Sequence, residues 1–262
     1  MNRILEVNTL TIHHSSSNLR LVHPLSFTIK SGEVLALVGA SGSGKSLVAQ
    51  ALFHILPTNL SWEGDIRLKG NLVHNKNVQN YRGKSMAYIP QSVDALDPFL
   101  KIGKQLKQLT PTHTGKKEII EGLKRLGLTK SILTKYPFEL SGGQARRILI
   151  LMALVSEADL IVADEPTPGI GEQATEDFRK LLLAKKDSGK AVLLITHDLD
   201  LASDVATKIA VMKDGKMVDI FPSSWLQKDA LDRNNLHPYT LELWNSLPRN
   251  LNTQEWFHAT RS

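Results

Sequence analysis

The sequence contains no cysteine among its 262 residues. This absence excludes disulfide bonds, zinc sites built on cysteine and iron–sulfur clusters held by cysteine. No apolar run approaches the roughly 18–20 residues that cross a bilayer. The segment Met1–Leu10 also lacks the apolar core of a secretory signal. We therefore expect a cytosolic chain without a membrane span of its own.

Blocks of like charge, internal repeats and low-complexity segments are also missing. Lysine and arginine number 32 against 26 acidic residues, a net charge of +6. A basic balance could indicate nucleic-acid binding, but no block of lysine and arginine stands out. It is equally consistent with a polyanionic nucleotide or an anionic membrane surface. With 42% hydrophobic residues, the chain can bury a sizeable core in one large domain or two small ones.

Short apolar runs alternate with helical patterns along the chain. Continuous apolar runs predict strands that are buried on both faces. These runs lie at 34–38, 160–163 and 191–195. Helical patterns follow at 47–56, which Pro57 should end, and at 178–186. This order predicts an α/β fold with a parallel sheet.

Three regions differ from that pattern. The first 30 residues alternate apolar and polar, which predicts antiparallel strands with a turn at 14–18. Apolar residues at helical spacing predict a helical insertion at about 95–158. Runs at 209–212 and 217–220 flank Asp214-Gly215, a hairpin signal. Beyond these runs we expect a helical or irregular tail.

Residues 39–46 form a complete G-x-x-x-x-G-K-S loop between a predicted strand and a predicted helix, as a phosphate-binding loop requires. Gly42 and Gly44 allow the backbone N–H groups to turn toward phosphate oxygens. The Lys45 ammonium would bridge the β- and γ-phosphates, and the Ser46 hydroxyl would bind Mg²⁺. The predicted nucleotide-binding residues of this loop are Gly39, Ala40, Ser41, Gly42, Ser43, Gly44, Lys45 and Ser46.

Polar residues follow the other predicted strands at their carboxyl ends, where ligands bind in parallel sheets. Asp164 fits a contact to Mg²⁺ through water, and Glu165 fits the residue that orients or deprotonates the attacking water. His197 would lie near the γ-phosphate, and Gln91 would contact Mg²⁺ and the water. Alone, the last two are ordinary polar turn residues. Beside the phosphate loop, we predict Glu165, His197 and Gln91 as catalytic residues, and Ser46, Gln91 and Asp164 as magnesium contacts.

A second glycine-rich segment, 140–144, precedes an amphipathic helix. Ser141 can cap that helix, whose N-terminus can bind an anion. A capped helix start needs no ligand. However, the 39–46 loop already surrounds its own phosphates, so a second anion site fits a nucleotide held by another chain. The predicted contacts across such a dimer are Ser141, Gly142, Gly143 and Gln144.

Together these motifs resemble the ATP-binding subunits of ABC transporters. The matches are the Walker A loop at 39–46, the Q-loop at Gln91, the signature at 140–144, Walker B with the catalytic glutamate at Asp164-Glu165 and the switch histidine at His197. The resemblance covers nearly the whole chain and implies a P-loop NTPase core with a parallel or mixed sheet. It also implies an antiparallel N-terminal β-subdomain and a helical insertion subdomain, in an ATPase domain at 1–221 followed by an extension at 222–262.

The same resemblance implies ATP and Mg²⁺ as cofactors and a peripheral position on the cytoplasmic face of the cell membrane. The implied partners are two permease subunits, a second ATPase subunit and, indirectly, an extracytoplasmic substrate-binding protein, with no nucleic acid. Hydrolysis of ATP by this chain would then drive import across the membrane.

Smaller motifs are similar to the peptide/nickel importer branch of that family. They are Tyr136-Pro137-Phe138-Glu139, His237-Pro238-Tyr239-Thr240 and Ser246-Leu247-Pro248. Segments 35–39, 44–47 and 55–57 look most like nickel-import subunits. Many peptide-import relatives carry C-terminal cysteines for an iron–sulfur cluster, which this chain lacks. The resemblance therefore implies import of nickel or a metal–chelator complex, with short peptides as the alternative.

Two departures from the family pattern stand out. Gly171 replaces the D-loop aspartate, which in the family couples the two ATP sites, so we expect unequal sites in a heterodimer. No aromatic residue near His13-His14 is available to stack on adenine, which is then held loosely or by a histidine ring. Because adjacent strand residues point to opposite faces, the histidine pair predicts two solvated side chains rather than a metal site.

Two other functions use the same ATP chemistry. Related domains act in DNA repair or on ribosomes, but the chain has neither a long coiled-coil insertion nor a second ATP domain. A regulatory partner that binds ATP without hydrolysis is supported only by Gly171, because Lys45, Glu165 and His197 are all present.

Overall fold

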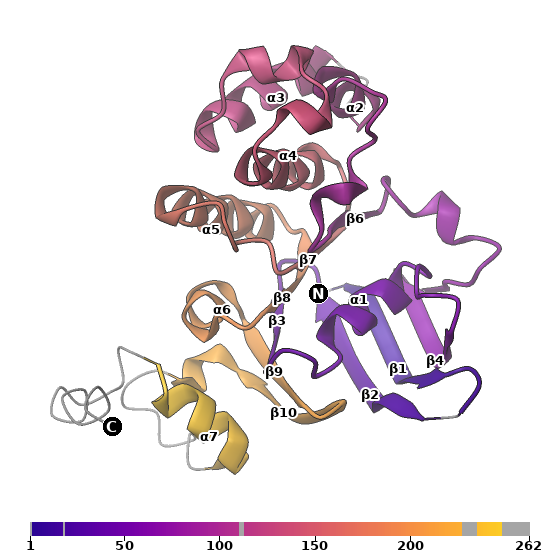
Figure 1. The fold of residues 1–262 in the computed structure, drawn as a ribbon. Coiled ribbons are helices and arrows are strands. Elements are labelled where there is room, and N and C mark those ends of the chain that lie inside the picture. The colour runs from indigo at the N-terminus through magenta and orange to yellow at the C-terminus, as the bar shows by residue number, and fades with distance from the viewer. Residues whose placement is uncertain (1, 18, 110–112, 227–234, 248–262) are drawn as a thin grey trace, which may run out of the picture.

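The computed structural model describes residues 2–17, 19–109, 113–226 and 235–247 (Figure 1). The strands are β1 (Arg3–His14), β2 (Arg20–Lys30), β3 (Val34–Val38), β4 (Leu60–Leu68), β5 (Asn71–Leu72), β6 (Met86–Ile89), β7 (Leu160–Asp164), β8 (Ala191–Thr196), β9 (Lys208–Lys213) and β10 (Lys216–Pro222). The α-helices are α1 (Lys45–Leu52), α2 (Ile102–Leu109), α3 (His113–Arg125), α4 (Gly142–Val155), α5 (Glu172–Asp187), α6 (Leu199–Val205) and α7 (Pro238–Asn245). Short 3₁₀ turns lie at Val78–Asn80, Val93–Ala95, Lys130–Thr134, Pro137–Glu139 and Ser223–Leu226.

The larger sheet has six strands in the order β10-β9-β3-β8-β7-β6. Five of them run parallel and β10 pairs antiparallel at one edge, so the predicted parallel sheet and terminal hairpin are confirmed. Asp214 and Gly215, both at positive φ, close that hairpin. Because β3 lies between β8 and β9, the carboxyl ends of strands distant in sequence meet at one edge.

The smaller sheet is antiparallel, in the order β2-β1-β4-β5. The pairing of β1 with β2 confirms the expected N-terminal strands, although Asn18 of the predicted turn lies outside the described residues. Strand β4 was not predicted. Only Ile66 and Leu68 among its residues are buried, and its register with β1 shifts between Asn8 and Thr11. A bulged strand with so few buried residues has no clear period-2 pattern.

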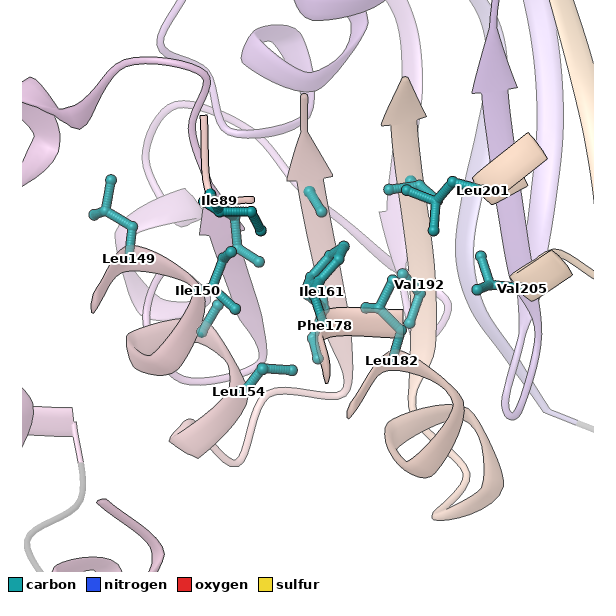
Figure 2. Packing of buried hydrophobic residues seen from close by; sticks show 14 of the residues in the cluster. Ile89, Leu149, Ile150, Leu154, Ile161, Phe178, Leu182, Val192, Leu201 and Val205 are labelled. Atoms are coloured by element: carbon teal, nitrogen blue, oxygen red, sulfur yellow. The ribbon is translucent and has the colours of Figure 1, made fainter. Parts of the chain in front are cut away.

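Successive residues of β3 face opposite cores, because side chains alternate across a strand. Val34, Ala36 and Val38 join the core under the helices, whereas Leu35 and Leu37 join the core between the two sheets and α1. In the first core (Figure 2), Ile161 of β7 and Val192 of β8 meet the residues of α4 and α5. Full burial of each large apolar side chain contributes roughly 1.5–3 kcal/mol. Because both faces of the central strands are packed in this way, the carboxyl ends of the strands, with the polar residues that follow them, are held at one edge of the sheet.

The helices cover the sheet as the sequence indicated, with changes at their ends. The periodic residues Ile119, Ile120 and Leu123 belong to α3, whereas Leu126 follows the end of that helix, and the periodic residues at 148–155 belong to α4. Helices α3 and α4 pack together above the sheet (Figure 1). Helix α5 begins at Glu172, earlier than the expected 178. The prediction of a helix at 47–56 was wrong at both ends, since α1 begins at Lys45 and stops at Leu52.

The early end of α1 has a local cause. His54 adopts a left-handed φ of 51°, and the Ile55 N–H donates to the Gln50 carbonyl at 2.9 Å. This pattern closes a helix C-terminus without help from proline. Pro57 therefore follows the helix end rather than causing it.

Helix α7 lies beside the edge strand β10 and is hydrogen-bonded to it (Figure 1). The Asp219 carboxylate accepts hydrogen bonds from the His237 N–H, at 2.8 Å, and from the Thr240 hydroxyl. Pro248 of the third branch motif lies outside the described residues. Among the helices that the structure describes, none is long and apolar enough to cross a membrane.

Candidate nucleotide site

The loop between β3 and α1 has the shape of a phosphate cradle. Gly42 and Gly44 adopt φ angles of 81° and 96°, the left-handed region that favours glycine. The Lys45 ammonium donates to the carbonyls of Gly39 and Ala40, both at 2.9 Å. Burial lowers the pKa of Lys45, and the nearby carboxylates of Glu165 and Asp164 oppose that shift. The buried ammonium is thus ready to exchange backbone carbonyls for phosphate oxygens.

The loop opens on a cavity of about 520 Å³, on the carboxyl side of the larger sheet. Its lining residues are Ser41, Gly42, Gly44, Lys45, Ser46, Leu47, Gln91, Glu165, Pro168 and His197. The structure therefore brings the predicted cradle and all three predicted catalytic residues to one cavity. Of the residues predicted to bind the chain's own nucleotide, Gly39, Ala40, Ser43 and Asp164 are not among the lining residues.

Asp164 and Ser46 form an oxygen-rich pair next to the cavity. The Ser46 hydroxyl donates to Oδ1 of Asp164 at 2.9 Å, and the Tyr88 hydroxyl donates to Oδ2 at 3.2 Å. Burial raises the pKa of Asp164, while these two hydrogen bonds act to lower it. Burial and the adjacent carboxylate also raise the pKa of Tyr88. A hydroxyl beside a carboxylate fits the preference of Mg²⁺ for oxygen ligands.

Glu165 and His197 form a second polar pair. Oε2 of Glu165 lies 2.9 Å from Nδ1 of His197, and the carboxylate is 10% exposed against 65% for the imidazole. Glu165 has a left-handed φ of 46°, which costs about 1–2 kcal/mol for a residue with a Cβ. Its N–H donates to the Ile195 carbonyl at 2.9 Å. With this backbone conformation, Glu165 is among the residues that line the cavity.

Several residues near the site were not predicted as site residues, although Tyr239 was noted as part of a branch motif. The Arg146 guanidinium donates to the backbone carbonyls of Glu165, at 2.7 Å, and Gln91, at 2.6 Å. The Tyr239 hydroxyl accepts from the Ala40 N–H at 3.2 Å, under the Lys213 ammonium 4.7 Å from its ring. Each contact joins elements far apart in sequence, so no local pattern could have indicated it.

The segment 140–144 forms the capped helix start that was expected. The Ser141 hydroxyl accepts from the Gln144 N–H at 3.2 Å, and Oε1 of Gln144 accepts from the Ser141 N–H at 3.1 Å. These residues are absent from the lining of the cavity in their own chain. The contact to a nucleotide of a second chain stays a prediction.

The two N-terminal histidines hydrogen-bond to serine side chains of the smaller sheet and its hairpin. Nε2 of His13 lies 3.0 Å from the Ser61 hydroxyl, and Nδ1 of His14 lies 2.9 Å from the Ser16 hydroxyl. Within the described residues there is no cluster of three metal-binding side chains. Neither histidine lines the cavity, and their contact with adenine stays a prediction.

Comparison with known proteins identifies the family to which the chain belongs. A family model described as ABC transporter matches residues 22–168. The chain is 33% identical to the metal-staphylopine import system ATP-binding protein CntD of Staphylococcus aureus, over 82% of this chain and 84% of that protein. It is 32% identical to the oligopeptide transport ATP-binding protein OppD of Bacillus subtilis, over 95% of this chain and 73% of that protein.

A further relative is longer. The uncharacterized ABC transporter ATP-binding protein YejF of Escherichia coli is 34% identical over 94% of this chain, which spans 49% of that protein. Among solved structures, the ATP-binding subunit of an ABC transporter superposes with a TM-score of 0.77 at 22% identity, covering 92% of this chain and 99% of that one. That likeness confirms the predicted P-loop fold. The chain therefore belongs to the ABC transporter family as an ATP-binding protein that takes ATP and Mg²⁺, similar to the peptide- and metal-import members.

Proposed function

We propose that this chain is the ATP-hydrolysing subunit that powers a membrane ABC importer. The observation that carries the proposal is the meeting of the phosphate cradle, Gln91, Glu165 and His197 around one cavity. Residues 1–221 form the ATPase domain and 222–262 an extension. The assembled subunit lies on the cytoplasmic face of the membrane.

The described residues divide the chemistry among them. Lys45 and the cradle N–H groups would bind the β- and γ-phosphates. Ser46 and Asp164, with Gln91, would hold Mg²⁺, which would neutralise phosphate charge. Glu165 orients or deprotonates the attacking water, and His197 holds the Glu165 carboxylate in place at 2.9 Å. The site thus combines positioning with electrostatic stabilisation.

Substitution of Glu165 by glutamine tests this assignment. The amide keeps the size of the side chain but cannot accept a proton, so ATP turnover in the assembled transporter should fall about a hundredfold or more, and import should stop. ATP affinity should persist, because the cradle is unchanged. Turnover and import at wild-type levels would show that Glu165 does not have this role.

We infer that two such chains share their ATP sites, with the 141–144 helix start of each capping the nucleotide of the other. The cap residues lie outside their own cavity, as such sharing needs. Gly171, at φ 82°, stands without a side chain at the N-cap of α5, where the family has aspartate. We therefore infer that the second chain is a related subunit, which supplies the aspartate that Gly171 replaces here, so that the pair is a heterodimer. A closed, fully active ATP dimer of the purified chain alone would contradict the heterodimer.

An apolar groove of about 410 Å³ lies between β6 and α4. Phe53, Ala87, Leu109, Leu149 and Met152 are among its lining residues. We infer that a cytoplasmic helix of the permease lays its apolar face here, because helices bind grooves of this kind through apolar anchors.

A charge in the groove tests the docking. Met152→Glu should abolish co-purification with the permeases, because it places a carboxylate against the apolar face of the docked helix. Ile220→Glu is the matched control, since Ile220 is exposed on β10 outside the groove. Equal co-purification of both variants would place the permease elsewhere.

The substrate that we propose is nickel or a metal–chelator complex, with short peptides as the second candidate. Support comes from the absence of cysteine and from the similarity to a metal-import protein, although peptide-transport proteins are equally similar at 32–33% identity. The extracytoplasmic binding protein would select the substrate. Deletion of the gene should lower nickel accumulation, and loss of peptide uptake with unchanged nickel would favour the second candidate.

A further inference from the structure

Arg146 lies one turn beyond the N-terminus of α4, the helix that begins at the predicted dimer contacts. Its guanidinium carries several N–H donors in a rigid fork. Nη1 donates to the Glu165 carbonyl at 2.7 Å, and Nη2 donates to the Gln91 carbonyl at 2.6 Å. One side chain of α4 therefore holds the backbones of two predicted catalytic residues from two different strand ends.

The contact to Glu165 bears on an unusual backbone. With φ at 46°, Glu165 leaves the conformations that a residue with a Cβ prefers. Its N–H donates to the Ile195 carbonyl, and its carbonyl accepts from the Arg146 guanidinium. Between these two anchors the chain directs the carboxylate toward His197. Loss of the guanidinium frees one anchor, and the carboxylate then moves relative to the cavity.

The contact to Gln91 adds a second link. Gln91 follows β6 after Pro90, and its side chain is exposed at the cavity. The same guanidinium thus sets the distance between the Gln91 and Glu165 backbones. A purely structural arginine lies next to it, because Arg147 joins the carbonyls of Gly143 and Leu126 within the helical region. Arg146 differs in reaching the catalytic edge of the sheet.

We propose that Arg146 is a positioning residue for ATP hydrolysis, which acts through the backbones of Glu165 and Gln91 and does not touch the nucleotide. The proposal rests on the role assigned to Glu165 above. It makes the orientation of α4, which carries Ser141–Gln144 at its start, a condition for the correct placement of the catalytic carboxylate.

The test is a set of variants of this chain, each measured in the assembled transporter. Arg146→Met removes both hydrogen bonds and keeps much of the apolar stem, so kcat should fall about tenfold to a hundredfold, as small misplacements of a catalytic group do. The KM for ATP should change by less than about threefold, since the cradle is untouched. Arg146→Lys, which can satisfy one carbonyl, should recover part of the rate. Arg179→Met, on the surface of α5, is the control, and its kcat should equal that of the unaltered chain.

A double variant separates positioning from a structural role. In the Glu165→Gln background, measured by slow single-turnover phosphate release, Arg146→Met should change the rate by less than about twofold, because residues that act as a unit are not additive. An equal fall in both backgrounds, a change confined to KM, or an unchanged kcat would overturn the proposal. If Glu165→Gln itself keeps the wild-type rate, the proposed function fails first, and that result is distinct from these.

Discussion

The first turn of α4 offers a matched pair of substitutions. Gly142 and Gly143 are successive residues of the same helix, yet a Cβ would meet nothing within 4 Å at Gly142 and the Gly169 carbonyl oxygen at 2.8 Å at Gly143. We expect Gly142→Ala to stabilise the nucleotide-free chain and Gly143→Ala to lose that gain, because an ordinary contact between these atoms is longer.

The size of the difference follows from two effects. Replacing glycine by alanine in a helix stabilises by up to about 1 kcal/mol, and by less in the first turn. Overpacking against a backbone atom costs about 1–3 kcal/mol. The two variants should therefore differ by about 1–3 kcal/mol, or roughly 2–4 °C in Tm for each kcal/mol in a chain of this size.

Urea unfolding followed by circular dichroism, without nucleotide, measures this difference from the midpoints at equal slope. The absence of ATP matters because a ligand would stabilise both variants by mass action. A Gly143→Ala chain as stable as Gly142→Ala would refute the close approach between the start of α4 and the loop at 168–171.

Three further results are expected. Mg²⁺-ATP at a hundred times its Kd should stabilise the chain by about 2.7 kcal/mol in thermal unfolding. The Lys45→Met chain should lose most of this stabilisation by nucleotide. Without nucleotide, the same variant should be more stable than the unaltered chain, because it no longer buries the Lys45 ammonium. Because burial raises the pKa of Asp164 above 3.8, the folded chain holds this proton at higher pH than the unfolded chain, and stability falls as pH rises through that window. The urea midpoint of Asp164→Asn should thus be higher than that of the unaltered chain at pH 7, and the two midpoints should become equal near pH 3.5. An equal difference in midpoint at both pH values would contradict the raised pKa of Asp164. Tyr239→Phe removes the acceptor of the Ala40 N–H and should raise the KM for ATP by about twofold to tenfold, with Tyr81→Phe as the control.

The cradle could be predicted from the sequence because its geometry is local. Gly42, Gly44, Lys45 and Ser46 act within one strand–loop–helix unit, and the glycines encode the left-handed turns directly. Asp164, Glu165 and His197 were also predictable, since a parallel sheet brings the ends of its apolar strands to one edge.

Other features depended on tertiary contacts that no sequence period encodes. Arg146 reaches Glu165 across 19 positions and Gln91 across 55. Strand β4 forms because β1 offers it a partner, and α1 stops because His54 turns left-handed before Pro57 is reached. These contacts come from packing, which overrides local preference when the two disagree.

The central place of β3 has a consequence for biosynthesis. Its two partners, β8 and β9, are made some 150 residues later than Val38, so an apolar strand that ends buried on both faces waits without a neighbour while they are translated. At about 5–20 residues per second this wait lasts roughly 8–30 s. During this interval, the nascent chain already contains the phosphate loop but not yet His197, which follows β8. We therefore expect the exposed apolar surface of β3 to be protected by chaperones until its partner strands have been made.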